Sequence, residues 1–151
     1  MEKLVIKGGK PLKGTVSING AKNAAVAILP ATVLINGKCK IENLPNISDV
    51  QISCKILEKL GAKLEWINKN TITIDTTDIC GNKAPIDMTS KFRASYYLIG
   101  SLLGRCQHAE VGLPGGCNLG ARPIDQHIKG FEALGATVSV ANGKVKATTK
   151  K

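Results

Sequence analysis

The sequence is poor in aromatic side chains, since only 3% of its 151 residues are Phe, Trp or Tyr. Proteins that bind single-stranded nucleic acid stack its bases on exposed rings, so this scarcity argues against a nucleic acid partner. The lysines and arginines are also dispersed along the chain instead of gathered in one helix. The formal net charge of +10 nevertheless indicates anionic partners, which leaves phosphorylated metabolites and acidic lipids as alternatives.

Long apolar runs and closely spaced cysteine pairs are also missing from the sequence. No window approaches the roughly 18 consecutive apolar residues that a membrane-spanning helix needs, so we expect no membrane insertion. The cysteines form no Cys-x-x-Cys pair, and His108 and His127 lack the spacing of metal ligands. We therefore expect a cytoplasmic, soluble protein with free thiols and no bound metal. The five cysteines are Cys39, Cys54, Cys80, Cys106 and Cys117.

The sequence contains an internal repeat. The segment Leu57–Trp66 (LEKLGAKLEW) reappears as Phe131–Val140 (FEALGATVSV), and each copy combines a helix end, a glycine stop and an alternating strand. Upstream, Lys38–Pro45 (KCKIENLP) matches Gln107–Pro114 (QHAEVGLP), and each follows an apolar helical stretch. The repeated unit spans roughly seventy residues in the order helix, strand, helix, strand, strand. This order predicts a mixed α/β (α+β) fold whose sheets bury one face against helices.

Hydrophobic periodicity predicts where these elements lie. Apolar residues three and four positions apart predict helices over residues 21–34, 48–60, 89–104 and 123–134. Alternation predicts strands over residues 38–43, 63–67, 71–75, 107–112, 137–141 and 144–148. We expect Asp49 to cap the second helix, Gly61 to end it, and Pro123 to occupy the first turn of the fourth helix. Residues 4–7 and 15–18 lie outside the repeat and are predicted to form two short strands.

The most unusual cluster of residues is the glycine-rich stretch 113–125 (LPGGCNLGARPID). Its three glycines leave backbone N–H groups free to face an anion, and it leads into a helix N-terminus, which also favours negative charge. That helix end and Arg122 would both favour the thiolate of Cys117 and make it a better nucleophile or acid–base group. Asp125 would hydrogen-bond a base or a sugar. The alternative is a turn that contains an inert cysteine.

Two further cations lie at the starts of predicted helices. Lys22 belongs to the stretch 19–25 (NGAKNAA), where small residues would let a ligand approach the backbone. This stretch lacks the spacing of a P-loop, and an ordinary turn with a solvated lysine is the alternative. Arg93 begins an apolar helix at a position where the first copy has Ala24, so it needs an anionic partner or a route to water. A surface salt bridge is the alternative for Arg93.

Four stretches of the sequence occur in a recognisable order: NGAKNAA (19–25), FRAS (92–95), LPGGC (113–117) and GARPIDQH (120–127). In length, order and spacing they resemble the UDP-N-acetylglucosamine enolpyruvyl transferases, and the similarity extends over the full chain. The resemblance implies a fold of enolpyruvyl-transferase-like repeats, an inside-out α/β barrel, of which this chain contains two of the three repeats of one domain.

The resemblance also implies an activity. The reaction is the transfer of enolpyruvate from phosphoenolpyruvate to the 3-hydroxyl of UDP-N-acetylglucosamine with release of phosphate, the first committed step of peptidoglycan biosynthesis. It would serve cell-wall biogenesis, cell shape and cell division, and it needs no metal or organic cofactor. By resemblance, Lys22 and Asn23 would contact phosphoenolpyruvate, Arg93 the nucleotide sugar, and Cys117 would protonate the enol carbon and react with fosfomycin. The uridine end would lie at Arg122, Pro123, Ile124, Asp125 and Gln126.

The chain departs from that family in length. Members have two domains of three repeats each, whereas repeat one here covers residues 21–80 and repeat two covers residues 88–149. We expect residues 21–151 to form part of one domain and the strands of residues 1–20 to pack in the other. The missing C-terminal part of the enzyme would carry further catalytic groups, so the chain is expected to be inactive alone. Alternatives are another enolpyruvyl transferase, a phosphate cyclase of related fold, or a non-catalytic fragment that binds a nucleotide sugar or another anion.

Overall fold

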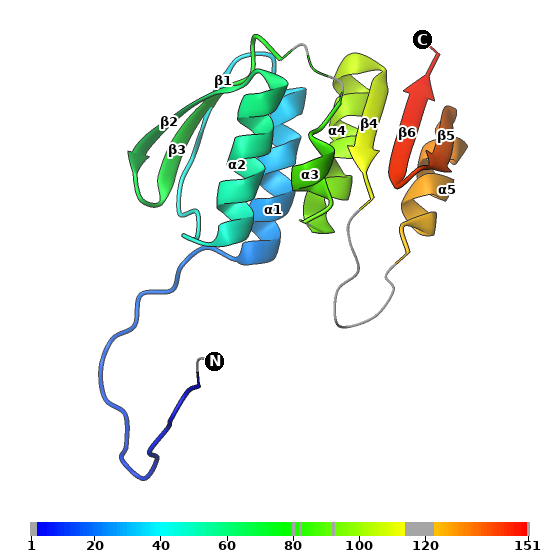
Figure 1. The fold of residues 1–151 in the computed structure, drawn as a ribbon. Helices are drawn as coiled ribbons and strands as arrows, with labels where there is room; N and C mark the ends of the chain where they lie inside the picture. Colours follow the sequence, from blue (N-terminus) through cyan, green and yellow to red (C-terminus); the bar gives the residue numbers. More distant parts are fainter. Residues whose placement is uncertain (1–2, 80, 82, 92, 114–122, 151) are drawn as a thin grey trace.

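The same order of helices and strands occurs twice along the chain (Figure 1). The computed structural model describes residues 3–79, 81, 83–91, 93–113 and 123–150. The first unit lies within residues 22–75 and the second within residues 86–149. In these described ranges, no helix combines the length and the apolar character that crossing a membrane requires.

The first unit contains two helices and a three-stranded antiparallel sheet. Its helical segments are α1 (Lys22–Ala31), the 3-10 turn η1 (Thr32–Leu34) that follows it, and α2 (Ser48–Leu60). Its strands are β1 (Lys38–Ile41), β2 (Lys63–Asn68) and β3 (Thr71–Asp75), with β3 in the middle. Gly61 ends α2 as predicted, because its φ of 108° lies in the left-handed region that favours glycine.

The second unit repeats this arrangement. Its helical segments are α3 (Ile86–Thr89), the 3-10 turn η2 (Arg93–Tyr96), α4 (Tyr97–Cys106) and α5 (Asp125–Ala133). Its strands are β4 (His108–Gly112), β5 (Ala136–Ala141) and β6 (Lys144–Thr149), with β6 in the middle. Both sheets therefore place their third strand between the first and the second, and the predicted mixed α/β fold of repeated units is confirmed.

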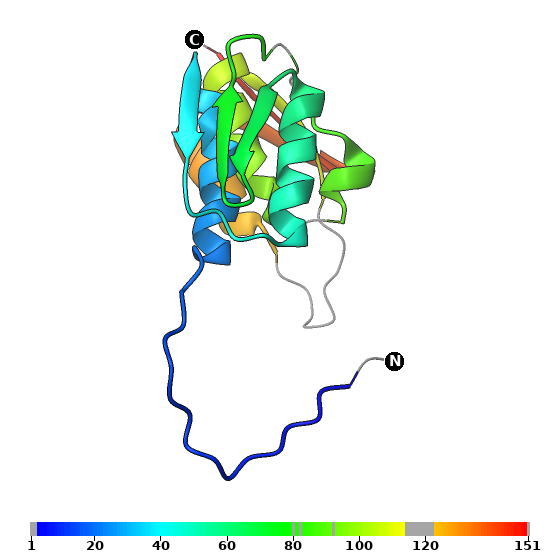
Figure 2. The same ribbon diagram turned by 90° about the vertical axis from the view of Figure 1, so that its left-hand side faces the viewer.

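Each sheet buries one face against the helices, as the alternating sequence predicts. In the central strands, every second side chain is buried, namely Ile72 and Ile74 in β3 and Val145 and Ala147 in β6. Figures 1 and 2 show the two sheets on opposite sides of the molecule, with α1, α2 and α4 between them. Buried side chains from both units form one hydrophobic core, so neither unit has a separate core of its own.

The Arg105 side chain ties the second unit to the first. Arg105 lies at the end of α4, and its Nη1 donates to one carbonyl oxygen of η1 and to the carbonyl oxygen of the residue after η1. Its Nη2 donates to the carbonyl oxygens of the two residues that follow β3 and to the side-chain oxygen of Asn36. Because carbonyls at the end of a helical turn lack partners within the turn, a guanidinium with five donors suits this position. The four carbonyl acceptors belong to Val33, Ile35, Thr76 and Thr77, at 2.9–3.3 Å.

The two strands predicted for residues 4–7 and 15–18 are not formed. Residues 3–20 contain no helix or strand, and they extend away from the rest of the structure (Figure 2). Their apolar side chains are solvent-exposed, with Leu4 94% and Leu12 98% exposed. A β-strand needs a neighbouring strand to satisfy its backbone N–H and C=O groups, and these residues have no such neighbour in the structure.

The predicted continuous helix over residues 89–104 is also wrong. α3 ends at Thr89, and η2 separates it from α4. At this break, side chains form hydrogen bonds that replace helical ones: Ser95 Oγ donates to the Thr89 carbonyl at 3.0 Å, and the Gly112 amide donates to Thr89 Oγ1 at 3.2 Å. Hydroxyl side chains compete in this way with regular helical hydrogen bonds, which explains why apolar periodicity alone failed here.

Two predicted helix starts differ from the structure. α5 begins at Asp125, so Pro123 precedes this helix instead of occupying its first turn. α2 has Ile47 at its N-cap, and no side chain caps it. Asp49, the predicted cap, lies in the first turn of α2, where its carboxylate contacts Lys22.

Replacing Arg105 with alanine is expected to lower the free energy of unfolding by about 2 kcal/mol, because hydrogen bonds to a charged group contribute more than neutral ones. Arg105→Lys should restore only part of this loss, since one ammonium cannot reach both the carbonyls at η1 and the carbonyls that follow β3. Urea unfolding followed by circular dichroism measures the change, and Lys63→Ala, at an exposed ion pair, is the control. Equal stability of Arg105→Ala and the control would contradict this assignment.

Candidate functional site

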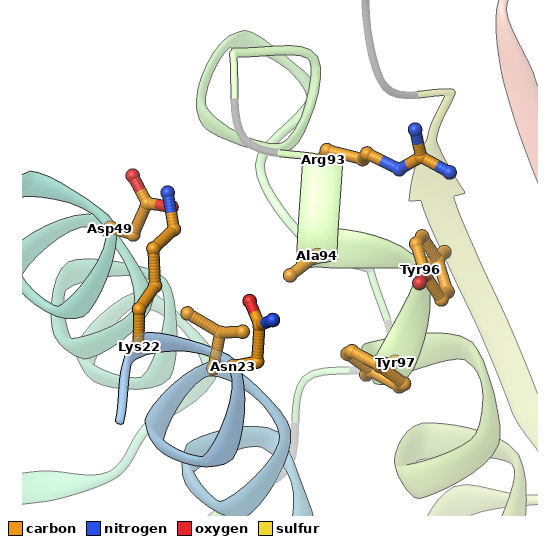
Figure 3. Close-up of a pocket in the computed structure, with 8 residues that line it drawn as sticks. Lys22, Asn23, Asp49, Arg93, Ala94, Tyr96 and Tyr97 are labelled. Carbon is orange, nitrogen blue, oxygen red and sulfur yellow. The ribbon is translucent and has the colours of Figure 1, made fainter. Parts of the chain in front are cut away.

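A cavity of about 470 Å³ lies where the N-terminal ends of α1 and α2 meet the turn from η2 into α4 (Figure 3). Its walls come from both units, so it exists only because the units pack together. Three predicted site residues, Lys22, Asn23 and Arg93, are among those that line it. The complete lining is Lys22, Asn23, Val26, Asp49, Arg93, Ala94, Tyr96 and Tyr97.

The N-terminus of α1 contributes positive charge to the cavity. Lys22 is the first residue of this helix, Asn23 follows it, and the first turn contains no acidic residue. The helix cap, Ala21, forms no side-chain hydrogen bond to the helix end. The first N–H groups of a helix lack partners within it and carry the positive end of the helix dipole, so this wall of the cavity favours an anion.

Asp49 also lines the cavity, although the sequence predicted it only as a helix cap. Its Oδ2 lies 2.5 Å from Lys22 Nζ, and its Oδ1 accepts a hydrogen bond from Ser48 Oγ at 3.4 Å. Figure 3 shows the Lys22 and Asp49 side chains side by side. The available signal in the sequence was an acidic residue in the first turn of a helix, which is common on surfaces and does not by itself indicate a ligand site.

Arg93 contributes the second cation of the wall. It is half-buried in η2, and its guanidinium points away from Lys22 (Figure 3). None of the ion pairs formed within the described part of the chain involves Arg93. The surface salt bridge considered for this residue is therefore not formed among the described residues, and the guanidinium is available to an anion at the cavity.

The described part of the predicted uridine-binding stretch, residues 123–126, lies beside the cavity and does not line it. Pro123, Asp125 and Gln126 are exposed and Ile124 is buried, and the Gln126 amide donates to the Asp125 carboxylate at 3.2 Å. The next residue, His127, makes an edge-on ring contact with Tyr96 of the cavity wall at 4.7 Å between centroids, and Tyr96 also contacts Tyr97 at 4.6 Å. An aromatic cluster therefore connects α5 to the cavity. Cys117 and Arg122 lie outside the described residues.

Among the described cysteines, Cys39, Cys54 and Cys106 are free thiols. Burial, and to a lesser extent the charge of Glu58, raises the pKa of Cys54 to about 12. Burial also raises the pKa of Cys39. Both thiols therefore stay protonated at neutral pH, where a thiol is a weak nucleophile. Within the described ranges, no three His, Cys, Asp or Glu side chains form a group that would hold a metal ion.

A second hollow with lysines is a weaker candidate for an anion site. It has a volume of about 210 Å³ at the second sheet and includes Lys144 and Lys146. The buried Glu110 of β4 faces both, with its carboxylate oxygens 2.9 Å from Lys144 Nζ and 3.7 Å from Lys146 Nζ. The hydrogen bond from Lys144 lowers the pKa of Glu110, which keeps this carboxylate charged. This carboxylate already pairs with both lysines, whereas Arg93 in the larger cavity forms no ion pair with a described residue, so the larger cavity is the better candidate.

Comparison with known proteins assigns the chain to a family. Residues 6–151 match the family model described as EPSP synthase (3-phosphoshikimate 1-carboxyvinyltransferase), so the chain belongs to this family. It is 51% identical over 151 residues to UDP-N-acetylglucosamine 1-carboxyvinyltransferase 3 of Caldanaerobacter subterraneus subsp. tengcongensis and 55% identical over 152 residues to UDP-N-acetylglucosamine 1-carboxyvinyltransferase 2 of Clostridium acetobutylicum. Each alignment covers 100% of this chain and 36% of the relative, so the chain spans about a third of their length. The resemblance inferred from the motifs is confirmed.

Solved structures confirm the fold. The enolpyruvyl transferase NikO from Streptomyces tendae superimposes with a TM-score of 0.79 at 24% identity, covering 95% of this chain and 32% of that chain. EPSP synthase from Acinetobacter baumannii superimposes with a TM-score of 0.67 at 17% identity, covering 94% of this chain and 33% of that chain. The repeated unit of helices and sheets is therefore an enolpyruvyl transferase fold.

The buried thiol of Cys54 is expected to be unreactive in the folded protein. At pH 8 a raised pKa leaves little thiolate, so modification by iodoacetamide should be at least about a hundredfold slower at Cys54 than in the unfolded chain. Peptide mapping by mass spectrometry after timed labelling gives the rate at each cysteine, with the half-buried Cys106 as an internal control. Equal rates for Cys54 in the folded and unfolded chain would contradict the burial described above.

Proposed function

We propose that this chain takes part in the transfer of enolpyruvate from phosphoenolpyruvate to the 3-hydroxyl of UDP-N-acetylglucosamine, with release of phosphate. The observation that carries the proposal is the identity of 51–55% over the whole chain to proteins named for this reaction. The cation-lined cavity supports it, because both substrates are polyanions and their reaction requires fixed positive groups. This reaction belongs to peptidoglycan biosynthesis, and its nucleotide-sugar substrate supports a proposed location in the cytoplasm.

The roles of individual residues follow from the motifs and the cavity. Lys22 and Asn23 bind phosphoenolpyruvate at the positive end of α1, and Arg93 binds the nucleotide sugar from the opposite wall. Cys117 gives its proton to the methylene carbon of phosphoenolpyruvate while the sugar hydroxyl adds to the neighbouring carbon and gives its own proton to a base in the remaining length of the enzyme. Loss of phosphate and of one methyl proton from this adduct then restores the C=C bond. The uridine end binds along residues 122–126, at the start of α5. The Tyr96–His127 ring contact supports this arrangement, because it links α5 to the cavity.

The domain organisation is part of the same proposal. Residues 21–151 form part of one domain, with repeat one over 21–80 and repeat two over 88–149, and residues 1–20 pair with strands of a second domain. The exposed apolar side chains of residues 3–20 support this assignment, because their burial would stabilise the contact. The relatives are about three times as long as this chain, and their remaining length would supply the second domain and the third repeat.

Calorimetric titration of the chain distinguishes a UDP-N-acetylglucosamine enolpyruvyl transferase from an EPSP synthase by the ligand that binds. We expect binding of UDP-N-acetylglucosamine and much weaker binding of shikimate 3-phosphate, the substrate class of the EPSP synthases. Arg93→Ala should weaken nucleotide-sugar binding at least about tenfold, since a charge-assisted hydrogen bond contributes roughly 1.5–3 kcal/mol. Lys63→Ala, which removes an exposed cation away from the cavity, should leave the affinity unchanged. Preferred binding of shikimate 3-phosphate would favour the other enolpyruvyl transferase instead.

Fosfomycin is expected to modify a single residue, Cys117. In an enzyme that joins this chain to the remaining two thirds of a relative, fosfomycin with UDP-N-acetylglucosamine should add one drug mass, and Cys117→Asp should prevent the addition. The raised pKa values of Cys39 and Cys54 support selective labelling, because protonated thiols do not open an epoxide readily. Peptide mass mapping that located the drug on another cysteine would refute the role of Cys117.

The runner-up is a fragment that binds an anion without turnover, and the cavity with Lys22 and Arg93, which lies wholly within this chain, supports it. Release of inorganic phosphate in the presence of both substrates separates the two functions. We expect none from the chain alone and measurable release when it is joined to the rest of a relative. Persistent inactivity of the joined enzyme, with nucleotide-sugar binding retained, would leave the binding fragment as the function.

A further inference from the structure

Asp49 is an acidic residue in a cavity wall whose other charged members, Lys22 and Arg93, are cations. A carboxylate repels an anionic substrate, so its presence in this wall needs a physical reason. We propose that Asp49 is a positioning residue, which holds the Lys22 ammonium in the orientation that meets the anionic substrate. This inference rests on the proposed function, because it takes the ligand of Lys22 to be a small phosphorylated carboxylate.

Lys22 has few other restraints on its side chain. The side chain is 59% exposed, and a lysine stem has four rotatable bonds. Lys22 is also the first residue of α1, where the helix dipole disfavours a cation and offers it no stabilising contact. The bond to Asp49 Oδ2 at 2.5 Å offsets both disadvantages. Because an ammonium has three N–H donors, a bond to one carboxylate leaves two donors for the substrate.

Asp49 is held more firmly than Lys22. Its side chain is only 25% exposed, and it lies in the first turn of α2, where the helix dipole favours an anion. Its second oxygen accepts the hydrogen bond from Ser48 Oγ at 3.4 Å. α2 packs against α1, so the two helix starts stay close together. Asp49 is therefore the fixed partner, and Lys22 is the side chain that it orients.

The ion pair between Lys63 and Asp78 provides a matched comparison. Its Nζ and Oδ2 lie 2.6 Å apart, but the side chains are 73% and 59% exposed, and neither residue lines the cavity. Exposed pairs of this kind contribute little to stability. Removing Asp78 deletes the same charge and the same kind of bond as removing Asp49. Only the Asp49 variant should affect an anion in the cavity.

Positioning and simple electrostatics predict opposite signs for the loss of Asp49. If the carboxylate acted only through its charge, Asp49→Asn would strengthen anion binding, because a repulsive group is removed. If Asp49 positions Lys22, the same substitution weakens binding, because the freed lysine must lose its rotamer freedom when the anion binds. The direction of the change in affinity therefore decides between the two roles.

Two measurements on the chain test the inference, each on wild type, Asp49→Asn, Asp49→Glu and Asp78→Asn. NMR relaxation of the Lys22 side chain at Cε reports its motion, and calorimetry with phosphoenolpyruvate as the probe reports affinity. We expect Asp49→Asn to make Lys22 as mobile as an unpaired surface lysine and to weaken binding roughly three- to tenfold. Asp49→Glu, which keeps a carboxylate within reach of the lysine, should restore most of the affinity. Asp78→Asn should change neither quantity.

Several results would overturn the inference. These are an unchanged motion of Lys22 in Asp49→Asn, an affinity that is equal or tighter in that variant, or an equal loss of affinity in Asp78→Asn. A wild-type chain that binds no phosphoenolpyruvate would contradict the proposed function instead, and the motion of Lys22 alone would then decide the inference. Circular dichroism of each variant shows whether it is folded, and Asp49→Ser, which also removes the carboxylate, replaces Asp49→Asn if the latter is not.

Discussion

The packing of α4 against η1 is the contact on which the candidate site depends. Gly104 permits a close approach, since a Cβ there would lie 3.0 Å from Leu34 Cδ2. Arg105 stabilises the contact by hydrogen bonds to a carbonyl of η1 and to the carbonyl of Thr76, which follows β3. The same helix begins at Tyr97, directly after η2, and Tyr97 lines the cavity. Its position relative to the first unit therefore determines how far Arg93 stands from Lys22. The cavity is a consequence of the junction between two similar units, and neither unit contains it alone.

Charge is distributed differently in the cavity than on the rest of the described surface. Elsewhere, carboxylates of the sheets and loops face lysines, as in the pairs formed by Asp75, Asp78 and Glu110. In the cavity, Asp49 pairs with Lys22, whereas Arg93 on another wall forms no ion pair with a described residue. A net charge of +10 is costly to a small folded chain through self-repulsion, and the proposed binding of polyanionic substrates would give this excess a use.

Much of the fold could be predicted from the sequence, because the repeat, the glycine stop at Gly61 and the strand alternation are local signals. The break between α3 and α4 could not, since it depends on the Ser95 bond to the Thr89 carbonyl and on the bond between Thr89 Oγ1 and the distant amide of Gly112. Residues 4–7 have the pattern of a strand but lack a partner strand in the structure, and no local pattern reveals that. The motifs predicted Lys22, Asn23 and Arg93, which line the cavity, whereas Asp49 was not predicted as part of it, because its contact with Lys22 depends on two helix starts that meet only in the folded chain.

The central claim is that the cavity lined by Lys22 and Arg93, which belong to different units, binds the anionic substrates of the proposed reaction. Amide and side-chain NMR spectra of the chain, titrated with phosphoenolpyruvate, test this claim most directly. The account predicts chemical-shift changes that saturate together at residues 22–23, at Asp49 and at residues 93–97, while Lys144 and Lys146 of the second hollow stay unchanged. Changes concentrated at Lys144 and Lys146, or spread evenly over the exposed lysines, would contradict it.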